Sequence, residues 1–232
     1  MRRVGHSVRT AGVPPASAHT NETRSAGVPP ASRLRRVPAG EGWRTRGYLP
    51  HFDAAEHVQH IVFRLADSLP AELHQRIAKA QSDEFGLVLD AALDQGHGSH
   101  NLAVPQIAEL VQTALLRFDS ERYRLIAWCV MPNHVHVLAE LKTGTRLDAV
   151  VHSWKSYTAK QADRLLERNG SFWAPEYFDR FMRDEEHVAR TAVYIEANPV
   201  KAGLCANICD WPYSSAWQGW GGRDARGPDL QQ

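Results

Sequence analysis

The stretch that most constrains this chain is Met131–Leu138 (MPNHVHVL), where two histidines stand two positions apart in an apolar run. The run before it, Tyr123–Val130, is rich in β-branched and aromatic residues and predicts a strand. A Pro-Asn pair then predicts a turn, so the histidine segment becomes the second strand of a hairpin. The two histidines, His134 and His136, therefore belong to one predicted strand.

Side chains two positions apart on a strand share a face of the sheet. His134 and His136 are accordingly expected to point to the same side. Two neutral imidazoles side by side form half of a metal site. From the pair alone, the alternative is two ordinary histidines on a half-exposed strand, and the downstream sequence decides between the two interpretations.

Composition narrows the class of protein. No apolar run approaches the roughly 20 residues that a membrane span needs. The basic N-terminal residues are not followed by an apolar segment, so no secretory signal is expected. The three cysteines, Cys129, Cys205 and Cys209, lack the spacing of zinc sites and are interpreted as reduced cytosolic thiols.

The N-terminal 46 residues differ from the rest of the chain. They carry nine arginines against Glu22 and Glu41, a net +7, which leaves −6 for the remainder of a chain whose overall charge is +1. The segment is rich in Pro, Gly, Ser and Ala, contains AGVPPAS twice, and is predicted to be disordered. It is either a basic arm with nonspecific phosphate affinity or the translation product of an upstream start codon. We expect one domain over residues 47–218 and a frayed tail over 219–232.

The net negative charge of residues 47–232 disfavours a protein that coats duplex DNA broadly, so any nucleic-acid contact should be local.

Hydrophobic periodicity predicts the remaining elements. The predicted order of strands and helices favours an α+β fold, a ferredoxin-like antiparallel sheet with helices packed on one face. Besides the hairpin, the predicted strands are His57–Ala66 and Phe172–Asp179, and the predicted helices are Ala71–Ala80, Asp83–Gly98, Val104–Phe118, Leu147–Arg168 and Asp184–Asn198.

Several separated motifs carry a family resemblance. MPNHVHVL is followed in order by KSYTAK at Lys155–Lys160, FWAPEYFDRFMRDEE at Phe172–Glu186, YIEANPVKAGL at Tyr194–Leu204 and the closing WPYSS. With GYLPHFD near Gly47, this set resembles the REP-associated tyrosine transposases, which belong to the one-tyrosine HUH class. The resemblance runs from about Gly47 to Trp217, and the ordered set is far more specific than the histidine pair alone.

The resemblance implies a single-strand DNA nickase and strand transferase of hairpin-forming repeat DNA. It implies that His134, His136 and a polar residue of the last helix hold a divalent cation, and that a tyrosine of that helix attacks the scissile phosphate. The matching positions are Tyr194 and Asn198, with Asn in place of the Gln of insertion-sequence relatives. They stand four residues apart, on one helix face. Tyr177 is the second candidate nucleophile.

Each of these residues also has a plainer interpretation. Tyr194 could be a core aromatic, and Asn198 before a proline could be a helix C-cap.

The implied metal ligands are neutral, so a bound cation would keep its full positive charge to interact with the phosphate. Mg²⁺ or Mn²⁺ is compatible with such ligands. Three basic residues of the long helix, Lys155, Lys160 and Arg164, are candidate DNA contacts or a solvated face.

Three functions can be weighed against these motifs. The favoured one is a transposase that forms a 5′-phosphotyrosine, in a bacterial, cytoplasmic and nucleoid-associated protein, monomeric or homodimeric. The alternative is a domesticated hairpin-binding protein of the same fold without turnover. A histidine-triad nucleotide hydrolase would need a further histidine at position 138, where this chain has Leu138.

Overall fold

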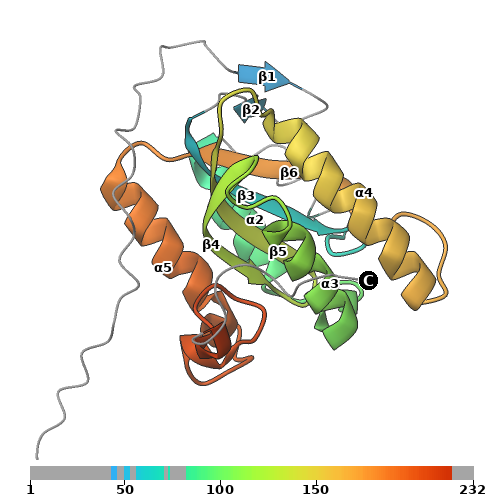
Figure 1. Cartoon of the computed structure of the whole chain (residues 1–232). Helices are drawn as coiled ribbons and strands as arrows, with labels where there is room; N and C mark the ends of the chain where they lie inside the picture. The colour runs from blue at the N-terminus through green and yellow to red at the C-terminus, as the bar shows by residue number, and fades with distance from the viewer. Residues whose placement is uncertain (1–42, 46–49, 53–55, 71–72, 74–81, 221–232) are drawn as a thin grey trace, which may run out of the picture.

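The centre of the molecule is a four-stranded antiparallel sheet with strand order β4-β5-β3-β6 (Figure 1). The computed structural model describes residues 43–45, 50–52, 56–70, 73 and 82–220. A second, two-stranded sheet pairs β1 with β2. The strands are β1 (Trp43–Thr45), β2 (Pro50–Phe52), β3 (Val58–Leu65), β4 (Tyr123–Val130), β5 (His134–Leu141) and β6 (Trp173–Phe181).

Four helices of the described residues accompany the sheet. They are α2 (Ser82–Leu93), α3 (Pro105–Leu116), α4 (Leu147–Leu165) and α5 (Glu185–Lys201), with short 3₁₀ turns at Asn101–Ala103, Ile208–Asp210 and Gln218–Trp220. The chain order β3-α3-β4-β5-α4-β6, combined with the strand order, is the ferredoxin-like arrangement, so the predicted α+β class is confirmed. Within the described residues, no helix combines the length and hydrophobicity that crossing a membrane demands.

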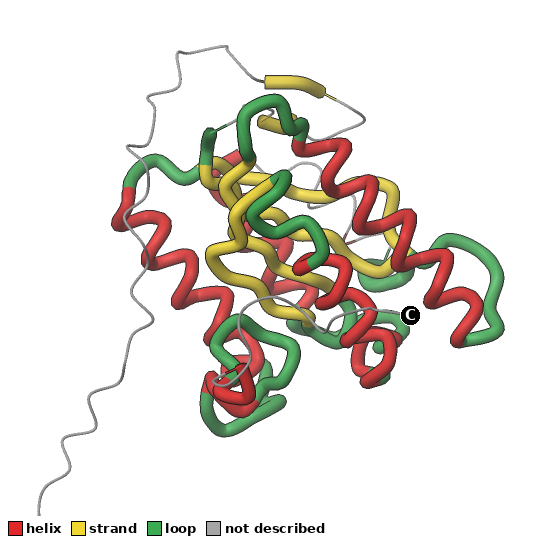
Figure 2. Tube along the Cα trace, in the orientation of Figure 1, coloured by secondary structure: helices red, strands yellow, loops and turns green. Residues whose placement is uncertain are grey.

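The helices cover both faces of the sheet (Figure 2), which corrects the prediction of helices on one face only. On one face, α3 and α4 pack on apolar residues that include Phe63, Val135 and Val137. On the other, α5 packs on Leu138 and its neighbours, and α2 packs on Val62. All eight residues of β3 are buried, and a central strand that is buried on both sides needs cover on both.

Some predicted boundaries are wrong. The last helix was expected to end at Asn198, but α5 continues through Pro199 to Lys201, and its C-cap is Ala202. Proline removes one backbone donor, a small loss in a final turn. The long helix ends at Leu165 rather than Arg168, because Glu167 adopts a left-handed backbone with φ 49°. The predicted helix Ala71–Ala80 lies almost wholly outside the described residues.

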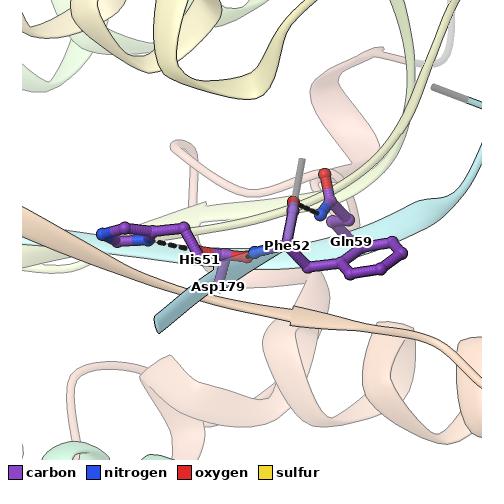
Figure 3. A network of polar contacts seen from close by, with 4 residues as sticks. All are labelled: His51, Phe52, Gln59 and Asp179. Atoms are coloured by element: carbon purple, nitrogen blue, oxygen red, sulfur yellow. Dashed lines mark hydrogen bonds and ion pairs between the residues drawn. The ribbon is translucent and has the colours of Figure 1, made fainter. Parts of the chain in front are cut away.

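The N-terminal segment is described only in part. The arm predicted to be disordered over residues 1–46 lies outside the described residues apart from β1, which is a paired strand. The adjacent β2 is anchored to β6 through Asp179 (Figure 3). One Asp179 oxygen lies 2.5 Å from His51 Nδ1, and the other accepts the Phe52 N–H at 2.8 Å. Gln59 of β3 donates to the Phe52 carbonyl from the other side.

Candidate functional site

The two histidines of β5 point to the same face of the sheet, as the strand alternation predicts. In the register with β3, His134 pairs with Arg64 and His136 with Val62. Both imidazoles are buried, with 1% of each residue exposed. Their Nε2 atoms lie 2.9 Å apart, so both rings present a nitrogen to one point.

The protonation of His134 follows from its neighbour Asn133. The Asn133 amide nitrogen donates to the Leu93 carbonyl at 3.1 Å, which turns its oxygen toward the imidazole. This oxygen can only accept, and it lies 2.7 Å from His134 Nδ1. His134 therefore carries its hydrogen on Nδ1 and directs the bare Nε2 toward His136.

A third histidine, His60 of β3, supports His136. Its Nε2 lies 3.0 Å from His136 Nδ1, and the two rings stack. When His136 carries its hydrogen on Nδ1 and donates it to His60, both Nε2 lone pairs converge. Two converging lone pairs 2.9 Å apart need a proton or a cation between them. A metal-binding histidine commonly donates its second N–H in this way.

Burial keeps all three imidazoles uncharged at neutral pH. It lowers the pKa of His60 to about 4, although the Asp90 carboxylate acts in the opposite direction. The pKa values of His134 and His136 are also well below the usual range because of burial and the neighbouring imidazoles. Neutral imidazole is the form that binds metal ions.

Helix α5 brings Tyr194 over these rings. The centroid of the half-buried phenol ring lies 6.1 Å from that of His136 and 6.4 Å from that of His60. The Lys201 ammonium lies 4.0 Å from the Tyr194 ring centroid, on the outer side of the same helix. One turn after Tyr194, Asn198 is 2% exposed, and its amide nitrogen has no hydrogen-bond partner among the described residues.

This donor set fits a divalent cation. The described part of the chain contains no group of three His, Cys, Asp or Glu side chains that could hold a metal. The sequence candidate for a third ligand, Asn198, is a buried amide whose oxygen is the atom that could bind a cation, while its nitrogen is the atom left without a hydrogen-bond partner. Amide oxygen and imidazole are neutral ligands that leave positions open for phosphate or water oxygens.

The Tyr194 hydroxyl is held by an acidic residue of α2. It donates to Asp90 Oδ2 at 2.7 Å. Burial, together with the charge of Asp90 and the hydrogen bond to it, raises the pKa of Tyr194 well above its ordinary value. Burial also raises the pKa of Asp90. Sequence reasoning missed both Asp90 and His60, because neither lies in a motif and both contacts join distant parts of the chain.

The second candidate nucleophile lies elsewhere. Tyr177 pairs with Phe63, so it projects from β6 onto the face covered by α3 and α4, opposite the histidine pair. Its ring lies 4.4 Å from that of His51. The structure therefore does not bring Tyr177 to the histidines. On that same face, Trp154 of α4 is 2% exposed and part of the core.

The three candidate DNA contacts differ in their surroundings. Lys155 Nζ donates to the carbonyl oxygens of Ala174 and Pro175 at 2.7 and 2.8 Å. Burial lowers the pKa of Lys155 to about 8. Lys160 and Arg164 are exposed on α4, on the other side of the sheet from the histidines. Lys155 thus ties α4 to β6, whereas the other two are accessible to a ligand.

Comparison with known proteins shows which family part of the chain is similar to. Residues 104–198 match the family model described as "Transposase IS200 like". The matched segment runs from the residue before α3 to Asn198 and includes the histidine pair and Tyr194.

Two curated relatives carry the more particular name of REP-associated tyrosine transposase. That of Haemophilus influenzae is 27% identical over 128 residues, covering 47% of this chain and 70% of the relative. That of Escherichia coli K12 is 25% identical over 108 residues, covering 46% and 63%. The resemblance to the REP-associated tyrosine transposases is therefore confirmed, although the match spans less than two thirds of the Escherichia coli protein.

A solved structure supports the fold. The REP-associated tyrosine transposase bound to a REP hairpin superposes with a TM-score of 0.50 at 16% identity, covering 78% of this chain and 92% of that one. Identity at this level establishes the common architecture alone.

Proposed function

We propose that this protein is a metal-dependent DNA nickase and strand transferase that acts on single-stranded, hairpin-forming repeat DNA. The observation that carries the proposal is the position of Tyr194, whose ring contacts the buried His136 on the face where both Nε2 atoms converge. A phenol beside a metal-binding imidazole pair is suited to attack on a phosphodiester. The names of the relatives support a REP-type hairpin as the DNA partner.

The residues divide the chemistry among them. Mg²⁺ or Mn²⁺ held by His134, His136 and Asn198 would offset the negative charge of the phosphate, a Lewis-acid role. Tyr194 Oη would form a bond to phosphorus while the bond to the 3′ oxygen breaks. The products are a 5′-phosphotyrosine and a free 3′-hydroxyl. The phosphodiester energy is retained in the adduct, so rejoining needs no nucleotide cofactor.

The sheet sets limits on where the rest of the DNA can bind. Lys160 and Arg164 are exposed on the face opposite the histidines, and we keep them as phosphate contacts for the hairpin stem. Lys201 lies beside Tyr194 and is an exposed cation that could contact the scissile strand. The two regions would then bind different parts of one folded DNA strand.

Detection of the covalent adduct tests the proposal. The protein is incubated with a DNA hairpin labelled at its 3′ end, the part that a 5′-phosphotyrosine would hold, and with Mn²⁺, and the products are separated on a denaturing gel. Label should migrate with wild-type protein, should disappear with EDTA or in Tyr194→Phe, and should persist in Tyr177→Phe. The last variant is the matched control, because it removes a phenol from the opposite face.

Two results would contradict parts of this proposal. Label that persists in Tyr194→Phe would exclude Tyr194 as the nucleophile. Retention of the hairpin on a native gel without any adduct from the wild type would favour the alternative, a hairpin-binding protein without turnover.

A further inference from the structure

Asp90 is the acidic side chain that touches the reacting atom of the proposed nucleophile. It lies on α2, is 8% exposed, and accepts the Tyr194 hydroxyl on Oδ2 at 2.7 Å. Its second oxygen, Oδ1, is buried and has no hydrogen-bond partner among the described residues. A buried carboxylate with one oxygen on the phenol and the other unsatisfied retains capacity to take up a proton.

We propose that Asp90 is the catalytic base that receives the Tyr194 proton during attack on DNA and returns it when the strand is rejoined. This inference rests on the proposed function and adds to it a residue of α2, a helix outside the matched family segment. The reaction needs a proton acceptor, because a phenol with an ordinary pKa near 10 is almost fully protonated at neutral pH. Contact with Asp90 and burial make spontaneous ionisation of Tyr194 rarer still.

The proposed step is balanced in atoms and charge. The Tyr194 Oη–H bond breaks as the proton passes to Asp90 Oδ2, and the Oη–P bond forms. The P–O3′ bond breaks, and the departing 3′ oxygen takes a proton from a water molecule, which becomes hydroxide. In rejoining, the 3′-hydroxyl loses its proton to hydroxide, which becomes water, and attacks phosphorus, while protonated Asp90 gives its proton back to Oη.

The surroundings of Asp90 suit this role. Burial raises its pKa, which makes the carboxylate a stronger proton acceptor than one on the surface. The charged or titratable groups facing it are His60 from β3, Lys201 and Tyr194 from α5, and Asp94 one turn further along α2. His60 is neutral at physiological pH, and Lys201 lies over the phenol ring, so neither forms a direct ion pair that would neutralise the carboxylate.

Paired substitutions on α2 test the proposal. Asp90→Asn keeps the size of the side chain but removes the proton acceptor, whereas Asp94→Asn removes the same charge from an exposed position. The rate of adduct formation should fall about 100-fold or more in Asp90→Asn and stay within about threefold in Asp94→Asn. The Kd for the hairpin, measured with Mg²⁺ present, should stay within about twofold in both. Asp90→Glu should recover at least about tenfold over Asp90→Asn.

The dependence of the rate on pH separates proton transfer from a structural role. Measured from pH 5.5 to 8.5, the wild-type rate should level off to a plateau once Asp90 is ionised. In Asp90→Asn, where hydroxide replaces the carboxylate, the rate should rise about tenfold per pH unit. If Asp90→Asn does not fold, the plateau in the wild type and the activity of Asp90→Glu decide the question.

Three outcomes would overturn the inference. One is an Asp90→Asn variant that forms adduct as fast as the wild type, or faster, which would make Asp90 a restraint on Tyr194 rather than a base. A second is a wild-type rate that rises tenfold per pH unit through the same range. The third is a wild type that forms no adduct, which defeats the proposed function first, whereas the other two leave it standing.

Discussion

Lowering the pH should unfold this protein through its three buried imidazoles, and the size of the effect follows from the structure. In the unfolded chain, His60, His134 and His136 would titrate near pH 6.5. In the folded chain their pKa values are lower, about 4 for His60 and well below normal for the other two. The unfolded state therefore binds more protons between pH 6.5 and 4, and the free energy of unfolding must fall as the pH decreases through that range.

The magnitude can be worked for the interval from pH 7.5 to 5.5. A histidine that is protonated only when unfolded costs about 1.4 kcal/mol of stability over this interval, so three cost about 4 kcal/mol. A typical domain has only about 5–15 kcal/mol in total. Buried carboxyl groups with a raised pKa, such as Asp90 and Glu196, act in the opposite direction as the pH falls. The net loss should therefore be somewhat smaller than 4 kcal/mol.

Urea denaturation at the two pH values, in the presence of EDTA, measures this loss. His60→Gln removes one of the three histidines. Between pH 7.5 and 5.5, its free energy of unfolding should fall by about 1 kcal/mol less than that of the wild type. His152→Gln, which removes an exposed histidine of α4, is the control and should not reduce the loss. Equal losses in wild type and His60→Gln would refute the conclusion that His60 is buried in its neutral form.

Two further predictions concern the opposite face of the sheet. Lys155→Ala should lower the free energy of unfolding by about 2 kcal/mol because it removes two hydrogen bonds from a charged group. Lys160→Ala and Arg164→Ala should leave the free energy of unfolding within about 0.5 kcal/mol of the wild type, and each should reduce the salt dependence of hairpin binding by about one unit of slope. Equal effects of all three substitutions on thermal melting would contradict this division. Asp179→Asn should destabilise the protein by about 2 kcal/mol because it weakens the contacts to β2, and chemical denaturation that shows no change would contradict it.

Local periodicity predicted the elements that carry the site. The strand Tyr123–Val130 is found with the predicted bounds, and the common face of His134 and His136 follows from a two-residue repeat. The i and i+4 spacing of Tyr194 and Asn198 likewise places both within α5. Each of these inferences needs only the geometry of one strand or one helix.

Contacts between distant segments lay beyond that reasoning. His60 meets His136 across 76 residues, and Tyr194 meets Asp90 across 104. Nothing in the local sequence of either partner indicates the other. The choice between Tyr177 and Tyr194 depends on which face of the sheet β6 presents, a property of its register with β3 rather than of its own composition. The two carbonyl groups of β6 that accept hydrogen bonds from Lys155 likewise belong to another element, so the sequence around Lys155 does not indicate them.

The imidazoles of β5 and the phenol of α5 belong to one polypeptide and already touch. A site assembled in this way requires no exchange of helices between copies, so diluting the protein would not separate Tyr194, the proposed nucleophile, from His134 and His136, the proposed metal ligands. Strand cleavage would then be first order in protein, and any pairing of two molecules would serve to bring two DNA ends together.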